Sequence, residues 1–219
     1  MKNYIFKNNG DKLEFVGDFD GLYQEQDDPW HQSGQDGDIK SYYENSRQRL
    51  NSLLSATQPS SLLEVGCGLG YTTNLIHQTV NCDITGMDIS KIAIEKARQL
   101  FPDIKFVSGD IMSKSIASDR QYNMIVLNQL LWYVLPSLDQ VIFNCDRLLT
   151  ASGKIVISQA FFKSTQTQKY GKDICDGFQG LLDYIIKNVS NKVTIASYNY
   201  DDSKNLLYND GLLVLRKII

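Results

Sequence analysis

A buried-strand signature, a glycine turn and a helix start follow one another in the segment LLEVGCGLGYTT, residues 62–73. The apolar residues before the turn suit a central strand of a parallel sheet. Three glycines come directly after them: Gly66, Gly68 and Gly70. Residues without Cβ let the main chain pass close to a ligand, and a helix that begins near Tyr71 points free N–H groups at the same place. The segment therefore predicts a nucleoside-bearing cofactor at a strand-to-helix turn.

Beyond this turn, apolar segments alternate with amphipathic helical patterns, which is typical of a doubly wound α/β sheet. After the strand at 62–65 we expect further strands at 83–90, 104–108, 123–127, 154–160, 193–200 and 211–218. We expect helices at 72–80, 91–100, 136–149 and 172–188. The order predicts a Rossmann-like, seven-stranded, mostly parallel sheet with helices on both faces.

The length of 219 residues fits a single domain, residues 1–219. We expect an N-terminal cap over residues 1–58 and a cofactor-binding core over 59–219. The segment 42–50 reads as a helix, so the cap is expected to be helical.

The composition of the chain limits which partners and which cellular location are expected. The net charge of −3 and the lack of any Lys or Arg run disfavour a nucleic-acid partner. The four cysteines lie far apart, without a C-x-x-C pair or a histidine cluster, so neither a metal site nor a disulfide framework is expected. The N-terminus lacks the apolar core of a signal peptide, and no apolar run is long enough for a membrane span. These features favour a cytoplasmic protein without a membrane partner, and they leave the oligomeric state open.

The spacing of the turn distinguishes two families of cofactor loop. A dinucleotide fingerprint, G-x-G-x-x-G, would need a glycine at Tyr71, whereas the sequence reads E-x-G-x-G-x-G from Glu64 to Gly70. This pattern resembles motif I of the class I S-adenosylmethionine (SAM) dependent methyltransferases. The resemblance implies that SAM is the cofactor and S-adenosylhomocysteine the product. It assigns the following residues to the cofactor loop: Glu64, Gly66, Cys67, Gly68 and Gly70. In the family, the residue at Glu64 orders the loop and helps to position the methionine amino group.

Further cofactor residues follow from the ends of the next strands. A carboxylate at Asp88 can accept the ribose hydroxyl protons, and by resemblance Asp110 receives the adenine amino group. Ile89 and Ile111 are suited to flank the adenine ring, and Asn128 is suited to meet the amino group of SAM. Two alternatives stay open, because Asp88 can serve as a charge at a helix N-terminus and Asp110 as a plain turn residue.

The N-terminal segment FDGLYQEQDDPWHQSG is dense in aromatic residues and carboxylates. It resembles the cap of small-molecule methyltransferases related to the nodulation N-methyltransferase, which acts on an amino sugar. The segment YYENSRQRL, residues 42–50, resembles the tyrosine and arginine pattern that those enzymes place against the SAM carboxylate, with Tyr43 and Arg47 at the matching positions. Trp30 is expected near the acceptor. The alternative is that Trp30 and the tyrosines only fasten the cap to the core.

The acceptor side has one candidate base and several candidate wall residues. We expect His31 to act as general base, because a histidine titrates near neutrality. Aromatic residues that follow the fourth and fifth strands are expected to wall the acceptor pocket: Trp132, Tyr133 and Phe161. The same rings packed beneath the cap would look identical in sequence.

The sequence thus predicts methyl transfer from SAM to a nitrogen or oxygen of a small molecule, with a sugar or amino sugar as first choice. The residues after the fourth strand read NQLL and lack the Asn/Asp-Pro-Pro-aromatic signature of adenine and glutamine methyltransferases. Three other classes stay open: a nicotinamide-dependent oxidoreductase, a non-catalytic SAM-binding module, and a protein or peptide methyltransferase.

Overall fold

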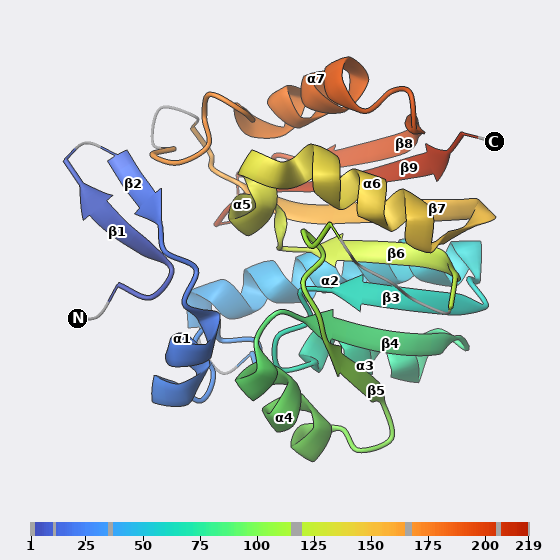
Figure 1. The fold of residues 1–219 in the computed structure, drawn as a ribbon, viewed down its shortest axis with the longest axis horizontal. Coiled ribbons are helices and arrows are strands. Elements are labelled where there is room, and N and C mark those ends of the chain that lie inside the picture. Colours follow the sequence, from blue (N-terminus) through green and yellow to red (C-terminus); the bar gives the residue numbers. More distant parts are fainter. Residues whose placement is uncertain are drawn as a thin grey trace.

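The computed structural model describes residues 3–10, 12–34, 37–114, 120–164, 168–204 and 207–218, with the backbone alone at 37 and 38. Its centre is a seven-stranded sheet of order β5-β4-β3-β6-β7-β9-β8 (Figure 1). The strands are β3 (Ser61–Val65), β4 (Asp83–Asp88), β5 (Lys105–Ser108), β6 (Tyr122–Asn128), β7 (Leu149–Phe161), β8 (Val193–Asp201) and β9 (Asn209–Lys217). The first five strands of this order pair in parallel, and β9 pairs antiparallel with both β7 and β8. The predicted Rossmann-like sheet is therefore confirmed.

Helices cover both faces of the sheet. On one face lie α2 (Gly37–Thr57), α3 (Tyr71–Thr79) and α4 (Lys91–Leu100), and on the other α6 (Leu138–Leu148) and α7 (Gly177–Asn188). Short α5 (Leu131–Val134) and the 3₁₀ turn η1 (Leu135–Ser137) lead from β6 into α6.

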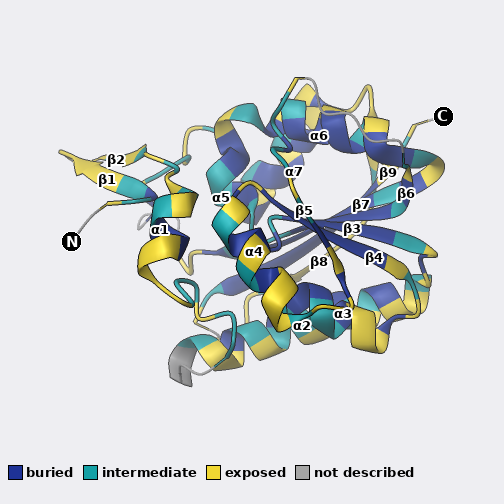
Figure 2. Cartoon of the chain, turned by 60° about the horizontal axis from the view of Figure 1, so that its bottom comes forward, coloured by how far each residue is buried: buried dark blue, intermediate teal, exposed yellow. Residues whose placement is uncertain are grey.

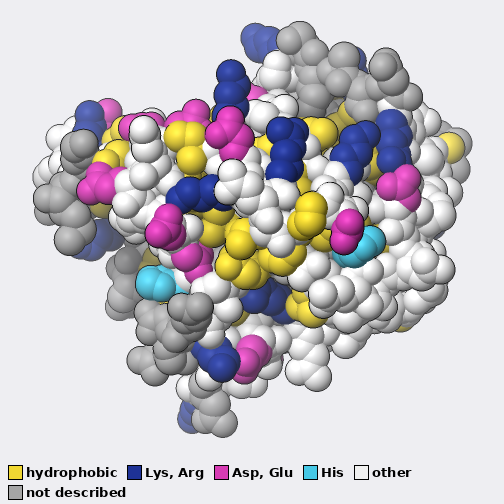
Figure 3. Space-filling view, turned by 90° about the horizontal axis from the view of Figure 1, so that it is seen from below, with side chains coloured by type: hydrophobic (Ala, Val, Ile, Leu, Met, Phe, Trp, Pro, Cys, Tyr) yellow, Lys and Arg dark blue, Asp and Glu magenta, His cyan; other side chains and the backbone are white. Residues whose placement is uncertain are grey.

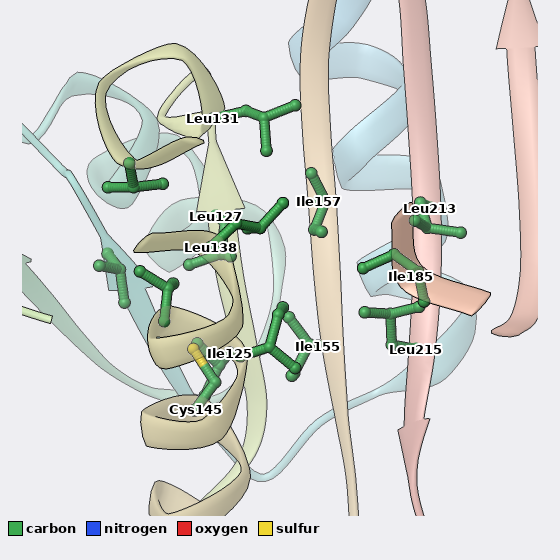
Figure 4. Packing of buried hydrophobic residues seen from close by; sticks show 14 of the residues in the cluster. Ile125, Leu127, Leu131, Leu138, Cys145, Ile155, Ile157, Ile185, Leu213 and Leu215 are labelled. Atoms are coloured by element: carbon green, nitrogen blue, oxygen red, sulfur yellow. The ribbon is translucent and has the colours of Figure 1, made fainter. Parts of the chain in front are cut away.

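The central strand β6 shows why the sheet needs both helical layers. Met124 and Val126 pack with the α2, α3 and α4 side, while Ile125 and Leu127 pack with α6 and α7. Figure 4 shows the second group, with Ile125 and Leu127 facing residues of α6. Residues on both faces are buried, as a parallel strand between two helical layers requires (Figure 2).

Several predicted boundaries differ from the structure, and three of them concern where an element begins near a turn. The helix expected from 136 begins at Leu138, because Pro136 lies in the preceding 3₁₀ turn. The helix expected from 172 begins at Gly177, whose φ of 69° is incompatible with continuing a right-handed helix towards the N-terminus. The strand expected from 154 begins at Leu149, which pairs with Tyr122 across an irregularity in the ladder.

The N-terminal region is not purely helical. β1 (Phe6–Asn9) and β2 (Lys12–Phe15) form an antiparallel hairpin, which is followed by α1 (Phe19–Glu25). Both elements lie beyond the carboxyl ends of the parallel strands (Figure 1). The helix expected over 42–50 is the middle of the longer α2, which buries Leu50 and Leu54 against the sheet. The division of the chain at residue 58 stays a prediction.

The outer edge of the sheet is strand β8, and its pairing with β9 shifts register between Ile195 and Ser197. Figure 3 shows one face of the molecule, on which side chains of both charges are interspersed among exposed hydrophobic ones. Within the ranges given above, no helix combines the length and the apolar character that a membrane crossing needs.

Candidate functional site

A pocket opens at the carboxyl ends of the parallel strands, where open α/β sheets bind their ligands. It holds about 900 Å³ of space free of protein atoms, including its open mouth. Residues that directly follow or end β3, β4, β5 and β6 line it, together with residues of α1, α2 and the segment between them. Its lining combines aromatic rings with a few polar side chains, as the lining of small-molecule sites does.

The glycine turn contributes Gly66 to the lining of this pocket. Gly66, Gly68 and Gly70 all have positive φ, and Gly70 precedes the first turn of α3. A Cβ on Gly66 would lie 2.7 Å from Leu130 Cδ1, and one on Gly68 would lie 2.6 Å from the Tyr23 hydroxyl oxygen. Only glycine therefore fits this path. Of the predicted loop residues, Gly66 lines the pocket, while Gly68, Gly70 and the buried Cys67 lie outside its lining.

Asp88 connects the glycine turn with α4. Its Oδ2 accepts the Gly68 N–H at 2.8 Å and its Oδ1 accepts the Ser90 N–H at 2.9 Å. Burial raises the pKa of the Asp88 carboxyl, and these backbone hydrogen bonds act in the opposite direction. Asp88 lines the pocket, so its role at the ribose stays a prediction, and its bond to Ser90 at the start of α4 fits the alternative of a charge near a helix N-terminus.

The predicted adenine residues lie together at one end of the pocket. Ile89, Asp110 and Ile111 all line it, and Ile111 is buried whereas Ile89 is exposed. Asp110 Oδ1 accepts the Met112 N–H at 2.8 Å, which is the turn contact that the alternative expected. That bond involves one carboxylate oxygen, and a carboxylate offers a second for a ligand.

Glu64 lies in a group of polar side chains next to the pocket. This carboxyl is 1% exposed and its Oε2 accepts the Thr73 hydroxyl at 2.5 Å. Burial raises the Glu64 pKa to about 7, and the Thr73 hydrogen bond and the Arg47 charge limit the rise. Glu64 lies behind the lining, whereas Arg47, Thr72 and Asn128 belong to it.

Arg47 is held in place from three sides. Its Nε donates to Thr72 Oγ1 at 3.2 Å and its Nη2 donates to the Gln32 carbonyl at 2.8 Å. The guanidinium carbon lies 5.1 Å from the ring centre of Tyr43, which also lines the pocket. Burial lowers the Arg47 pKa. The predicted pair of Tyr43 and Arg47 is thus brought together beside Asn128, whose Nδ2 donates to the same Thr72 hydroxyl at 3.4 Å.

Sequence reasoning missed Gln32, which connects the N-terminal segment with the glycine turn. Its Oε1 accepts the Leu69 N–H at 3.1 Å. Asp28 holds the segment by accepting the Gln32 and Ser33 N–H groups, both at 2.8 Å. An aspartate that accepts N–H groups of the residues following it is a turn signal, but nothing in the sequence indicates what the glutamine contacts.

Gln129 is a second lining residue without a sequence signature. Its backbone has a φ of 54°, and its Oε1 accepts the Ala160 N–H at 2.9 Å. Its Nε2 donates to the Tyr42 hydroxyl at 2.9 Å, and that hydroxyl donates to the fully buried Asp210 at 3.0 Å. The amide fastens the end of β6 to β7 and α2.

The predicted acceptor residues divide into two groups. Trp30 and Tyr133 line the pocket. Trp132 and Phe161 lie outside the lining, since the Trp132 Nε1 donates to the Ala160 carbonyl at 3.1 Å and Phe161 is 1% exposed beneath it. These two rings pack against each other at 5.8 Å and belong to the hydrophobic core, and the alternative of packing beneath the cap stays a prediction.

His31, the predicted base, has an exposed side chain and a φ of 52°, and it lies outside the pocket lining. Its catalytic role stays a prediction. In the part of the chain that the structure describes, no group of three or more His, Cys, Asp or Glu side chains is arranged to hold a metal ion.

Residues 62–153 match a family described as methyltransferase domain. The malonyl-[acyl-carrier protein] O-methyltransferase of Bacillus anthracis is 30% identical over 156 residues, which cover 70% of this chain and 53% of that protein. The trans-aconitate 2-methyltransferase of Escherichia coli is 32% identical over 95 residues, which cover 43% and 36%. The chain therefore spans about a third to a half of the length of these relatives.

Two solved structures share the fold over most of the chain. The N-methyltransferase NodS from Bradyrhizobium japonicum, in complex with S-adenosylhomocysteine, has a TM-score of 0.66 at 20% identity and covers 91% of this chain and 97% of its own. The magnesium protoporphyrin IX methyltransferase from Synechocystis, with bound SAM, has a TM-score of 0.64 at 16% identity and covers 86% and 89%. At these identities the two likenesses establish the fold.

Proposed function

We propose that this chain, which has the domain and the fold of a class I SAM-dependent methyltransferase, transfers a methyl group from SAM to a nitrogen or oxygen of a small-molecule acceptor. The observation that carries the proposal is one pocket that collects Gly66, Asp88, Asp110 and Asn128 from the ends of four neighbouring strands. The cofactor is SAM, and S-adenosylhomocysteine is the product.

The lining residues fit the three parts of SAM. Asp88 suits the ribose hydroxyls, and Ile89, Ile111 and Asp110 suit the adenine ring and its amino group. The main chain at Gly66 passes close to the pocket at a position where a Cβ does not fit, which suits the contact of a ligand with the backbone.

The methionine tail needs partners for a carboxylate and an ammonium group. Arg47 lies close to Asn128 and carries five N–H groups, more than the two that Thr72 and Gln32 accept, and the acid Glu64 lies behind them. Tyr43 positions Arg47 through the contact of its ring with the guanidinium. Cys67, Gly68 and Gly70 then act by shaping the turn, since the lining excludes them.

When bound, SAM supplies a methyl carbon made electrophilic by a sulfonium. The acceptor atom forms a bond to that carbon while the carbon–sulfur bond breaks, the electron pair stays on sulfur, and the acceptor loses its proton. Such an in-line displacement depends on orientation and on the exclusion of water. An apolar wall that can orient the acceptor and exclude water is supplied by the rings of Phe19, Trp30 and Tyr133.

A sugar or amino sugar remains our first choice of acceptor. The support is a pocket with aromatic walls, together with an acidic net charge. The names of the relatives and neighbours include both N- and O-methyltransferases, so they favour neither atom. If His31 is the base, it must reach the acceptor from its exposed position, and turnover of His31→Ala tests that role.

The test has a binding and a catalytic stage. Isothermal titration of the protein with SAM and with NAD should give saturable heat for SAM alone. Conversion of labelled SAM to S-adenosylhomocysteine is then measured with sugars, amino sugars, other amines, carboxylic acids and peptides. We expect release with a sugar or amino sugar. SAM binding without release for any acceptor would instead identify a non-catalytic SAM-binding module, and release with peptides alone would identify a peptide methyltransferase.

A further inference from the structure

Tyr133 lies at the centre of a cluster of aromatic rings beside the pocket. Its ring centre is 5.5 Å from that of Trp30 and 5.5 Å from that of Phe19, and all three side chains line the pocket. On its other side Tyr133 contacts Phe6 at 6.2 Å and Phe15 at 6.5 Å. One ring therefore connects the pocket wall with the N-terminal hairpin.

The hairpin presents one aromatic face to this cluster. Phe6 and Phe15 are paired across β1 and β2, with ring centres 5.5 Å apart, and both also contact Tyr170. The next pair, Lys7 and Glu14, points to the opposite side because side chains alternate along a strand, and it forms an exposed ion pair at 3.0 Å. The hairpin thus has a packing face and a solvent face.

Several polar atoms of the wall are already engaged. The Tyr43 hydroxyl donates to the Trp30 carbonyl at 2.9 Å, and the Trp30 side chain is hydrogen-bonded to Tyr23. The Gln129 amide is used within the protein on both its oxygen and its nitrogen. What Phe19, Trp30 and Tyr133 offer an acceptor is mainly ring surface, which is suited to a flat apolar face.

We propose that Tyr133 contacts the acceptor and determines specificity, and that the hairpin β1–β2 positions its ring through Phe6 and Phe15. The site takes an acceptor with a flat apolar face, such as the C–H face of a sugar ring or an aryl group. This inference rests on the proposed function, since it concerns the acceptor side of the same pocket. Phe6 and Phe15 are positioning residues, because neither lines the pocket.

The experiment uses Trp30 as reporter. The chain has two tryptophans, so Trp132→Phe leaves Trp30 as the sole tryptophan. In this background, protein saturated with S-adenosylhomocysteine is titrated with 4-nitrophenyl 2-amino-2-deoxy-β-D-glucopyranoside, whose nitrophenyl group quenches tryptophan emission. The Kd of the probe is compared among Phe6→Ala/Phe15→Ala, Phe6→Tyr/Phe15→Tyr, and the matched solvent-face variant Lys7→Ala/Glu14→Ala.

We expect the double alanine variant to raise the Kd of the probe about fivefold or more, since two ring contacts to Tyr133 are lost. The tyrosine variant should restore most of the affinity, and the solvent-face variant should match the parent. The Kd of S-adenosylhomocysteine, from isothermal titration, should change less than about twofold in all of them.

Three results would overturn the inference: an unchanged Kd of the probe in the double alanine variant, an equal loss of S-adenosylhomocysteine affinity in that variant, or no saturable quenching in the parent. In each case binding of S-adenosylhomocysteine by the parent leaves the proposed function standing. A parent protein that binds neither S-adenosylhomocysteine nor SAM would instead refute the proposed function.

Discussion

The buried carboxyl of Glu64 makes the stability of the protein depend on pH in a way that one substitution can reveal. Burial raises the Glu64 pKa from 4.5 to about 7. The folded protein therefore binds this proton more tightly than the unfolded chain does. The stability that the group contributes is complete below pH 4.5 and is lost as the pH rises through about 7. At about 1.36 kcal/mol per pH unit, the full effect is about 3 kcal/mol.

Glu64→Gln keeps the size of the side chain and an oxygen for the Thr73 hydroxyl, but it does not titrate. The free energy of unfolding of the variant, relative to the parent, should rise by about 2–3 kcal/mol between pH 5 and pH 8.5. Urea denaturation of both proteins across this range, without cofactor, measures the difference. The exposed Glu95 provides a matched control, and Glu95→Gln should show no such rise.

A stability difference between Glu64→Gln and the parent that stays constant from pH 5 to pH 8.5 would refute the reasoning. It would mean that the carboxyl holds its proton no more tightly in the folded protein than in the unfolded chain. A rise of equal size for Glu95→Gln would refute it as well, because the effect would then not come from burial.

Three further predictions concern the pocket, two on its cofactor side and one on its acceptor side. Asp88→Asn removes a carboxylate that can accept ribose hydroxyls, so it should weaken SAM binding at least about tenfold in isothermal titration. His31→Ala should leave the SAM affinity within about twofold. Equal losses would contradict the division between cofactor and acceptor residues. Turnover with an identified acceptor should fall about 10²-fold or more in His31→Ala if this residue is the base, and unchanged turnover would remove that role. Gly68→Val places a Cβ 2.6 Å from the Tyr23 hydroxyl oxygen on a backbone with a φ of 54°. The protein should fold but lose SAM affinity more than about tenfold. Retained affinity, with an unchanged circular dichroism spectrum, would count against the glycine turn as the site.

The sheet was predictable because its strands carry a strong local signal. Leu62, Leu63 and Val65 must be apolar to lie between two helical layers, and the glycines after them mark the turn. Asp88 was predictable for a related reason, since it ends a strand at the edge where the ligand binds. Periodicity and strand order sufficed for these residues.

The N-terminal hairpin and the glutamines were not predictable in the same way. The strands β1 and β2 are short, and their alternate residues are Lys, Asn and Glu, so the alternation is weak. Asn9 and Gly10 are a typical hairpin turn pair, but this pair predicts a hairpin only when it lies between longer strands with clear alternation. Gln32 and Gln129 act through contacts with residues distant in sequence, which no local pattern reveals.

The register shift in β8 has a consequence for how copies of the protein meet. β8 ends the sheet, and an edge strand presents unpaired N–H and C=O groups that another chain can add to. The shift between Ile195 and Ser197 is an irregularity of the kind that bends a strand and increases its local twist. A bent edge does not match a second straight strand, so the interruption protects the sheet from growing into an aggregate at its outer side.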